Sequence, residues 1–442
     1  MKKRLIIHFT LLCLFFTSLQ AQSDHFIEDL LKKHPDKFAN ILQNAADKRV
    51  QILYTQIDRD KNNQPTFRSY RFRVQTNEYF YPASTVKFPA CLLALEKLNG
   101  LNLKDVHKNT WMLTDSCEGI PNYPPQYNDS TALDFRPSIA QYIKKILLVS
   151  DNDANNRLYE FIGQELFNKN LYLKGYKDLR IVHRLDIAMS RLENRRSNPI
   201  RFVSDKEVEI DTITQIDPDT YETKTIVKYR PKNIYSQSQQ LSATTFEPEN
   251  PIKIGKGYVK NGKIVEEPFD FTYKNCFPID NQQAILRAVL FPESVAKEQR
   301  FNLTNDDYNL ILKYMSMSPL ESSYPHYPDK DSSGAWDSYC KFLMFGDSKK
   351  PMPKHIRIFN KVGDAYGFLT DNAYVVDFEK GVEFMLTATI YCNSDGIFND
   401  DTYDYETVGM PFMAHLGQTI YDYEVKRKRP NKPDLAKFKL KY

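Results

Sequence analysis

The sequence predicts an α+β protein, with strands near both ends of the chain and helices between them. Apolar and polar side chains alternate over residues 50–57 and 67–74, as in half-buried strands, and the polar turn between them predicts an antiparallel pair. Residues 137–149 instead repeat apolar side chains at helical spacing, and a second helix is expected over 154–162. Strand-like segments return late in the chain, at residues 355–361, 367–378 and 382–392.

Other segments complete this outline. Residues 25–45 are expected to form an amphipathic helix, and residues 201–275 a polar, β-rich insertion. Further helices are expected at 281–290, 305–317 and 407–423. The tail from Val425 carries eight basic residues and one acid. We expect it to be a solvated, loosely ordered end, with binding to an anionic cell envelope as the alternative.

The first 21 residues have the pattern of a secretory signal peptide. Met1-Lys2-Lys3-Arg4 is basic, an apolar run extends from Leu5 to Phe16, and Ala21 stands at the expected cleavage site. The apolar run is too short to span a membrane permanently, and no other segment is long and apolar enough to do so. The sequence therefore predicts a bacterial protein that is periplasmic or secreted.

Composition excludes several classes of function. Of the 442 residues, 41% are hydrophobic and 26% charged, which is ordinary for a globular chain of two lobes. Without residues 1–21, which hold three basic residues and no acid, the charge is 57 minus 56, or +1, so no nucleic-acid partner is expected. Eight scattered histidines without ligand spacing argue against a zinc hydrolase, and no metal or other cofactor is expected. The five remaining cysteines are widely spaced, which favours buried thiols with at most one disulfide.

The segment from Tyr81 to Ala90 is a short loop that leads into an apolar helix. Ser84 and Lys87 are three residues apart, so at a helix start they lie on one face and bring a hydroxyl beside an amine. Burial of the helix would desolvate Lys87 and lower its pKa, and a neutral amine can take the proton of a serine. Taken alone, the pair is better explained as an N-cap serine followed by a solvated lysine.

Two more motifs follow in order: Ser150-Asp151-Asn152, which alone indicates only a polar turn between helices, and Lys361-Val362-Gly363 on a late strand. Together with Ser84-Thr85-Val86-Lys87 they resemble the motifs of the penicillin-recognising serine hydrolases, and most closely those of the class A β-lactamases. His183-Arg184-Leu185-Asp186 resembles the segment that leads into the omega loop of that family, and Thr370-Asp371-Asn372 resembles the turn after its Lys-Thr-Gly strand.

The resemblance implies a three-layer α-β-α fold. A five-stranded antiparallel sheet would be built from both chain ends and flanked by helices, and a mostly helical lobe would pack against it. The active site would lie between the sheet and the lobe. The domain would span residues 22–424, with 201–275 inserted and 425–442 as a basic tail, and we expect it to be a monomer.

The resemblance also implies catalytic roles. Ser84 would be the nucleophile, Lys87 its base or proton relay, and Ser150 the group that passes a proton to the leaving nitrogen. The chemistry would be acyl transfer through a covalent intermediate on Ser84, which water then releases.

Four further residues would bind the substrate: Asn152, Lys361, Gly363 and Asp364. Asn152 would donate to a substrate amide, and Lys361 would supply positive charge near Ser150 and near a substrate carboxylate. The backbone N–H groups of Ser84 and Asp364 would form an oxyanion hole, in which each donor typically contributes about 3–4 kcal/mol to the transition state.

Two positions depart from the family pattern. Val362 stands where the family has Thr or Ser, whose hydroxyl helps to hold the substrate carboxylate, so we expect Val362 to be a specificity residue. The second departure is at the position of the glutamate that activates water for deacylation in the family. Counting from Arg184 places Met189 there, whereas the Arg-x-Glu pattern places Glu193 there with Asn198 nearby, and we favour Glu193.

The sequence therefore predicts an exported serine hydrolase of class A β-lactamase type, acting through Ser84 on a β-lactam or related amide. One alternative is a peptidoglycan D,D-peptidase or esterase-like hydrolase on the same scaffold, which need not use Glu193. Another is a non-catalytic binding relative. The intact Ser84–Lys87 and Ser150–Asn152 pairs argue against that last alternative, since a retired site has no need of them.

Overall fold

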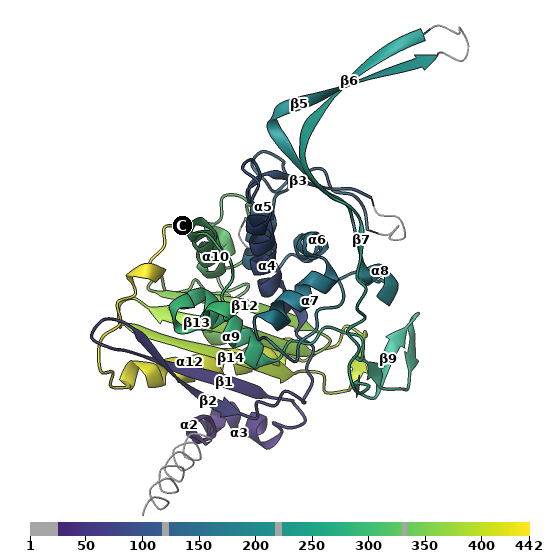
Figure 1. Ribbon diagram of the computed structural model, residues 1–442. Coiled ribbons are helices and arrows are strands. Elements are labelled where there is room, and N and C mark those ends of the chain that lie inside the picture. Colours follow the sequence, from purple (N-terminus) through teal and green to yellow (C-terminus); the bar gives the residue numbers. More distant parts are fainter. Residues whose placement is uncertain (1–24, 117–122, 217–222, 329–333) are drawn as a thin grey trace, which may run out of the picture.

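The computed structural model describes residues 25–116, 123–216, 223–328 and 334–442, apart from the side chains of residues 211–216, 223, 224 and 226 (Figure 1). The predicted signal peptide lies outside these residues. Within the described ranges, no helix is both long and apolar enough to cross a membrane.

A five-stranded sheet forms the centre of the molecule and joins the two ends of the chain. Its strands run in the order β12-β13-β14-β1-β2, and each neighbouring pair is antiparallel. Ile52 of β1 lies opposite Phe72 of β2 and Ala388 of β14, so the two early strands extend the sheet formed by three late ones. The predicted fold class is confirmed. The strands span Gln51–Arg59 (β1), Pro65–Phe72 (β2), Ile356–Ala365 (β12), Phe368–Asp377 (β13) and Val382–Tyr391 (β14).

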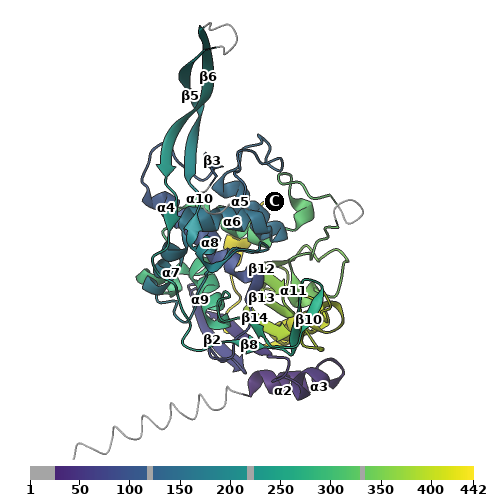
Figure 2. The ribbon, with the colours of Figure 1, turned by 90° about the vertical axis from the view of Figure 1, so that its right-hand side faces the viewer.

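Helices cover both faces of this sheet (Figures 1 and 2). One face packs against α2 (Phe26–Lys32), α3 (Pro35–Gln43) and α12 (Met410–Lys426), whose apolar side chains are buried together with those of the sheet. The other face contacts α9 (Ile279–Leu290), and beyond it lies the helical lobe. The lobe contains α4 (Lys87–Gly100), α5 (Ile139–Val149), α6 (Asn152–Ile162), α7 (Gln164–Leu173) and α10 (Asn305–Ser316).

Helix α4 lies at the core of the lobe, in contact with α5, α6 and α7. Its residues from Lys87 to Leu95 are all buried, because nearly every position in this run is apolar and neighbours surround the helix. A short 3₁₀ turn, η1 (Ala83–Val86), precedes it and contacts β12 and β13. The start of α4 therefore lies where the lobe meets the sheet.

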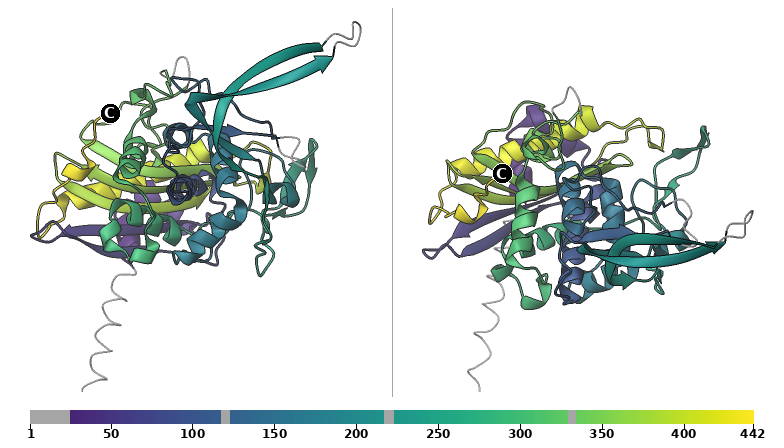
Figure 3. Two further views of the ribbon diagram at one scale, coloured as in Figure 1. Left: turned by 45° about the horizontal axis from the view of Figure 1, so that its top comes forward. Right: turned by 90° about the horizontal axis from the view of Figure 1, so that it is seen from above.

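The stretch between the lobe and α9 consists largely of strands. β5 (Ile200–Ile216) and β6 (Thr223–Gln237) form a long antiparallel hairpin that projects from the lobe, and β3 (Trp111–Thr114) pairs with the base of β5 (Figures 1 and 3). The chain then returns to the body through short strands, one of which pairs in parallel with a late strand, β15 (Ile397–Phe398). These short strands are β7 (Gln240–Leu241), β8 (Lys253–Ile254), β9 (Gly257–Lys260), β10 (Lys263–Val265) and β11 (Phe269–Asp270).

Small elements fill the connections. They are α8 (Arg191–Arg195), β4 (Arg196–Ser197), α11 (Phe342–Phe345), the 3₁₀ turns at Pro292–Ser294, Lys297–Gln299, Pro319–Glu321 and Ala436–Phe438, and a π turn at Tyr405–Gly409.

Two predicted helices have different bounds in the structure. The helix expected over 25–45 is two helices, because Pro35 cannot donate a backbone N–H and restricts the residue before it, yet fits the first turn of α3. The helix expected over 137–149 begins at Ile139, because the Oγ of Ser138 accepts a hydrogen bond from the Gln141 N–H at 3.2 Å and caps it.

The C-terminal tail is packed onto the body, so the expectation of a loosely ordered end is wrong. Leu435 and Phe438 are buried. The Phe438 ring lies 4.8 Å from that of Tyr374 on the sheet, and Lys437 donates a hydrogen bond of 2.7 Å to the backbone oxygen of Leu290. Two apolar anchors outweigh the surrounding basic charge here, because exposed lysines can extend into water around a buried phenylalanine.

Candidate active site

Ser84 lies in the 3₁₀ turn that leads into α4, half-buried at the wall of a cavity. The turn is fixed by the neighbouring Thr85, whose N–H and hydroxyl both donate to the backbone oxygen of Pro82, at 3.1 and 2.7 Å. Ala83 adopts a left-handed conformation with φ of 46°, which is unusual for a residue with a side chain and marks a backbone held by its surroundings.

One turn later, the side chain of Lys87 is fully buried. Its Nζ donates to the Oδ1 of Asn152 at 2.6 Å, to the Oγ of Ser150 at 3.3 Å, and to the backbone oxygen of Ser150. Burial and the nearby charge of Lys361 hold the pKa of Lys87 well below its ordinary value. The amine is therefore available as a base at a lower pH than a free lysine.

The turn between α5 and α6 brings Ser150 and Asn152 to this lysine. Ser150 ends α5 in the left-handed conformation, with φ of 60°, and Asp151 starts α6 by accepting a hydrogen bond of 2.7 Å from the Ala154 N–H. The predicted polar turn thus has a cap on each helix, and these two caps set the direction in which Ser150 and Asn152 point.

A second buried lysine reaches the same serine from the sheet. The Nζ of Lys361 on β12 donates to the Oγ of Ser150 at 2.8 Å and to the backbone oxygen of Val362 at 2.9 Å. Burial lowers the pKa of Lys361 as well. A hydroxyl can accept one hydrogen bond while donating its own proton, so Ser150 can accept from Lys361 and donate to a neutral Lys87.

Gly363 allows β12 to lie directly against the Ser84 turn. A Cβ at this position would lie 2.7 Å from the backbone oxygen of Pro82 and 2.7 Å from the backbone nitrogen of Ser84. Only a residue without a side chain fits between these two backbones. The next residue, Asp364, lines the same cavity as Ser84.

Val362 does not face this cavity, so its expected role as a specificity residue is wrong. Successive residues of a strand point to opposite faces. Lys361 points to Ser150, and Val362 is buried in the apolar cluster on the other face, with 2% of its surface exposed. A hydroxyl at position 362 would lie among apolar side chains.

The loop from residue 183 to residue 198 forms one wall of the cavity and is held by a buried ion pair. The guanidinium of Arg184 lies 2.7 Å from the carboxylate of Glu160 on α6, and both side chains are fully buried. Arg184 also donates to the backbone oxygen of Arg196 at 2.7 Å, and Glu160 accepts from the Asn198 N–H at 3.1 Å. Both ends of the loop are therefore fixed to one point on α6.

Glu193 lies on this loop but outside the cavity. Its carboxylate accepts from the Ser190 N–H at 2.6 Å, and its own N–H donates to the Ser190 Oγ at 3.2 Å, which together form a capping box at the start of α8. These bonds to Ser190 lower the pKa of Glu193. Met189, the other residue considered for the deacylation base, lines the cavity but has no group that can accept a proton from water.

Asp186 is the carboxylate that this loop places in the cavity, and the sequence reasoning missed it. It lines the cavity together with Ser84, and its Oδ2 accepts from the Nδ2 of Asn152 at 3.3 Å. The same Asn152 amide accepts from Lys87, so Asp186 is connected to Lys87 through one side chain. Asp186 also has a left-handed backbone with φ of 55°. The signal for it was present, since Asp186 is the acid of the loop motif itself.

The structure therefore brings together seven of the eight predicted site residues: Ser84, Lys87, Ser150, Asn152, Lys361, Gly363 and Asp364. Glu193 is the one it leaves outside. In the described ranges, no group of three or more His, Cys, Asp or Glu side chains could hold a metal ion, and the four cysteines found there are free thiols.

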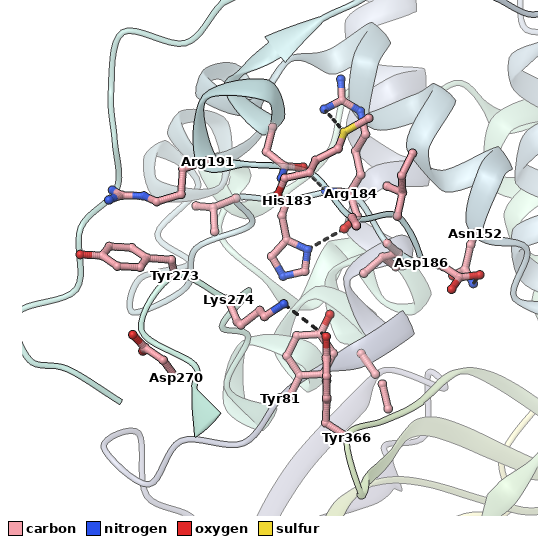
Figure 4. Close-up of a pocket in the computed structure, with 18 of the residues that line it drawn as sticks. Tyr81, Asn152, His183, Arg184, Asp186, Arg191, Asp270, Tyr273, Lys274 and Tyr366 are labelled. Atoms are coloured by element: carbon pink, nitrogen blue, oxygen red, sulfur yellow. Dashed lines mark hydrogen bonds between the residues drawn. The ribbon is translucent and has the colours of Figure 1, made fainter. Parts of the chain in front are cut away.

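The cavity has a volume of about 1160 Å³ and extends well beyond Ser84. It runs from Ser84 and Asn152 past Asp186 and His183 to Lys274, with residues 269–274 and 399–403 contributing to its far wall (Figure 4). Neither Ser150 nor Lys361 lines it, so the cavity extends away from the two buried lysines.

Residues 34–245 match the model of the Beta-lactamase enzyme family, whereas no curated protein matches the chain. Three solved structures illustrate the likeness. A β-lactamase from Sphaerobacter thermophilus is 10% identical over 88% of this chain and 96% of its own, with a TM-score of 0.43. One from Xanthomonas campestris is 13% identical over 90% and 98%, with a TM-score of 0.44. One from Streptomyces albus G is 11% identical over 86% and 96%, with a TM-score of 0.42.

The resemblance seen in the motifs thus agrees with an independent match over residues 34–245, which includes the Ser84, Ser150 and Arg184 segments. The family match and the five-stranded fold support a serine β-lactamase-like hydrolase of the penicillin-recognising serine hydrolase superfamily.

Proposed function

We propose that the protein is an exported serine hydrolase of class A β-lactamase type, which cleaves a β-lactam or related amide through an acyl-enzyme on Ser84. The observation that carries this proposal is the environment of Lys87: a fully buried amine with a lowered pKa, one turn from Ser84 and hydrogen-bonded to Ser150 and Asn152. A non-catalytic relative would have no need to keep a buried amine in this state. Export rests on the pattern of residues 1–21.

In the acylation step, neutral Lys87 takes the proton of the Ser84 hydroxyl while its Oγ attacks the amide carbonyl carbon. The backbone N–H groups of Ser84 and Asp364 hold the developing oxyanion. As the bond from carbon to nitrogen breaks, Ser150 gives its proton to the leaving nitrogen and receives the proton held by Lys87. Lys361 stabilises the electron pair on the Ser150 oxygen during this transfer, since its Nζ lies 2.8 Å away.

In the deacylation step, we assign the activation of water to Asp186 in place of Glu193. Asp186 lines the cavity of the acyl-enzyme, whereas the carboxylate of Glu193 is engaged in a helix cap. Water would give a proton to Asp186 as it attacks the acyl carbon, and that same proton would return through Lys87 to the Ser84 oxygen as it leaves, which restores both groups. The pairing of Arg184 with Glu160 keeps the loop in place for this step.

The position of Glu193 also favours a second candidate, a peptidoglycan D,D-peptidase or esterase-like hydrolase, because such an enzyme need not use that residue. A cavity of about 1160 Å³ has room for an extended acyl chain as well as for a small bicyclic amide. Both candidates share Ser84, Lys87, Ser150 and Asn152 and act as monomers in this proposal. They differ in how fast water releases the acyl group.

The test is a time course of intact mass after incubation with benzylpenicillin. The wild-type protein should gain the mass of one penicillin, and Ser84→Ala should gain none. Ser323→Ala, which changes an exposed serine that does not line the cavity, should label like the wild type. Rapid loss of the adduct indicates a β-lactamase, and a long-lived adduct indicates the peptidase-like candidate. Labelling that persists in Ser84→Ala would overturn the proposal.

A further inference from the structure

A lysine lies at the far end of the cavity, beside two aromatic rings. Lys274 is half-buried, and its Nζ lies 3.2 Å from the Tyr366 hydroxyl. The amine lies over the rings of Tyr366 and Phe269, 5.3 and 5.8 Å from their centres (Figure 4). Among the residues that the structure describes, Lys274 forms no salt bridge, and Asp270 points away from it in Figure 4.

The other cations of this region are already engaged. Arg191 forms an ion pair with Glu247 and lies over the ring of Tyr273, 3.7 Å from its centre. Arg195 donates to the backbone oxygen of Ser242 at 2.6 and 3.0 Å. Lys274 is therefore the cation on this wall whose charge is available to a ligand.

Aromatic side chains lie beside Lys274 on the side of the cavity toward Ser84, whereas Asp270 and Asp401 contribute acids to its far wall. The rings of Tyr81 and His183 are stacked, with centres 6.0 Å apart and planes 1° apart. Burial and the charge of Lys274 lower the pKa of His183 to about 4, so its imidazole is neutral at pH 7. Tyr366 meets Tyr81 edge-on at 5.0 Å and closes the wall. A flat or apolar group can pack against these rings.

The mechanism decides which part of the substrate enters this space. The leaving nitrogen must meet Ser150 to receive its proton, and Ser150 does not line the cavity. The acyl part of the substrate must then lie on the other side of the scissile bond, in the cavity with Asn152, Tyr366 and Lys274.

Resting on the function proposed above, we infer that Lys274 forms an anion subsite for the acyl part of the substrate, binding a carboxylate while Tyr81 and Tyr366 pack against the adjoining chain. The substrate class is an amide whose acyl arm is acidic, as in a peptide that carries a carboxylate side chain. Lys274 lies in the segment that follows the projecting hairpin and belongs to none of the sequence motifs.

Two penicillins that differ by one group test this inference: benzylpenicillin and its α-carboxybenzyl analogue, in which the acyl side chain carries a carboxylate. The measurement is the second-order rate of Ser84 acylation by each, followed by intact mass on the full protein. A hydrogen bond to a charged group corresponds to about tenfold or more in rate. The wild type should therefore acylate at least about tenfold faster with the carboxylated compound than with benzylpenicillin.

Variants locate the effect. Lys274→Gln should bring the ratio of the two rates to about one, and Lys274→Arg should keep the preference because the charge remains. Lys260→Gln, which changes an exposed lysine on β9, should leave the ratio at its wild-type value. If Lys274→Gln does not fold, Lys274→Met, which removes the charge from a side chain of similar length, takes its place.

Each outcome has one meaning. Equal wild-type rates with the two penicillins would overturn the subsite while leaving Ser84 acylation established. A preference that survives in Lys274→Gln would also overturn it. If neither compound acylates Ser84, the proposed function is wrong and the subsite falls with it.

Discussion

Two acids compete for the role of deacylation base: Asp186, which lines the cavity, and Glu193, which the sequence favoured. Substituting Asp186 by Asn distinguishes between them. Asn has nearly the shape of Asp and can still accept from the Asn152 amide, now 3.3 Å from Oδ2, so the link to Lys87 is retained. What is lost is the ability to accept a proton from water. A general base contributes about 10²–10⁴-fold to its step, or about 3–5 kcal/mol at 1.36 kcal/mol per decade. Because Asp186 is exposed, its neutralisation leaves no buried charge unpaired and stability should change little.

The assay is the lifetime of the Ser84 adduct by intact mass, after excess penicillin is removed. Asp186→Asn should form the adduct at close to the wild-type rate and retain it about 10²–10⁴-fold longer. Glu193→Gln is the matched control: it removes one carboxylate from the same loop, outside the cavity, and should leave the lifetime at its wild-type value. The reasoning is refuted if Glu193→Gln prolongs the adduct and Asp186→Asn does not.

Three further predictions follow from the same geometry. The rate of Ser84 acylation should rise with pH through an apparent pKa below that of free lysine, because burial and Lys361 lower the pKa of Lys87 and only its neutral form takes a proton; a rate that is flat from about pH 5 to 9 would contradict this. Val362→Thr should lower the free energy of unfolding, measured by urea denaturation, by about 1–3 kcal/mol, because its hydroxyl would be buried without a partner. The substitution should not speed acylation, and faster acylation would show that position 362 reaches the substrate. Gly363→Ala should slow acylation by about 10²-fold or more, because its Cβ would lie 2.7 Å from the Ser84 backbone nitrogen and displace Ser84. Gly100→Ala is the control and should match the wild type, because its added Cβ has no atom within 4 Å.

The sequence predicted the features that depend on near neighbours in the chain. Ser84 and Lys87 share a helix face because they are three residues apart, and the apolar run after them determined that α4 would be buried. The alternating segments predicted the strands of the sheet within a few residues of their bounds. For Val362 the sequence prediction differed from the structure, which buries this side chain in the apolar cluster while Lys361 reaches Ser150.

Other features depend on contacts between residues far apart in the sequence, and only the folded structure decided these. Glu193 and Asp186 are both acids on one polar loop, and the difference between them arises from where the buried Arg184–Glu160 pair holds that loop against α6. Lys274 meets Tyr366 across 92 positions of sequence. Such contacts follow from the packing of whole elements around a shared core, so no local sequence pattern predicts them. The sequence by itself predicted the sheet and the shared helix face of Ser84 and Lys87, whereas tertiary packing decided which carboxylate of the loop enters the cavity and what charge lies at its far end.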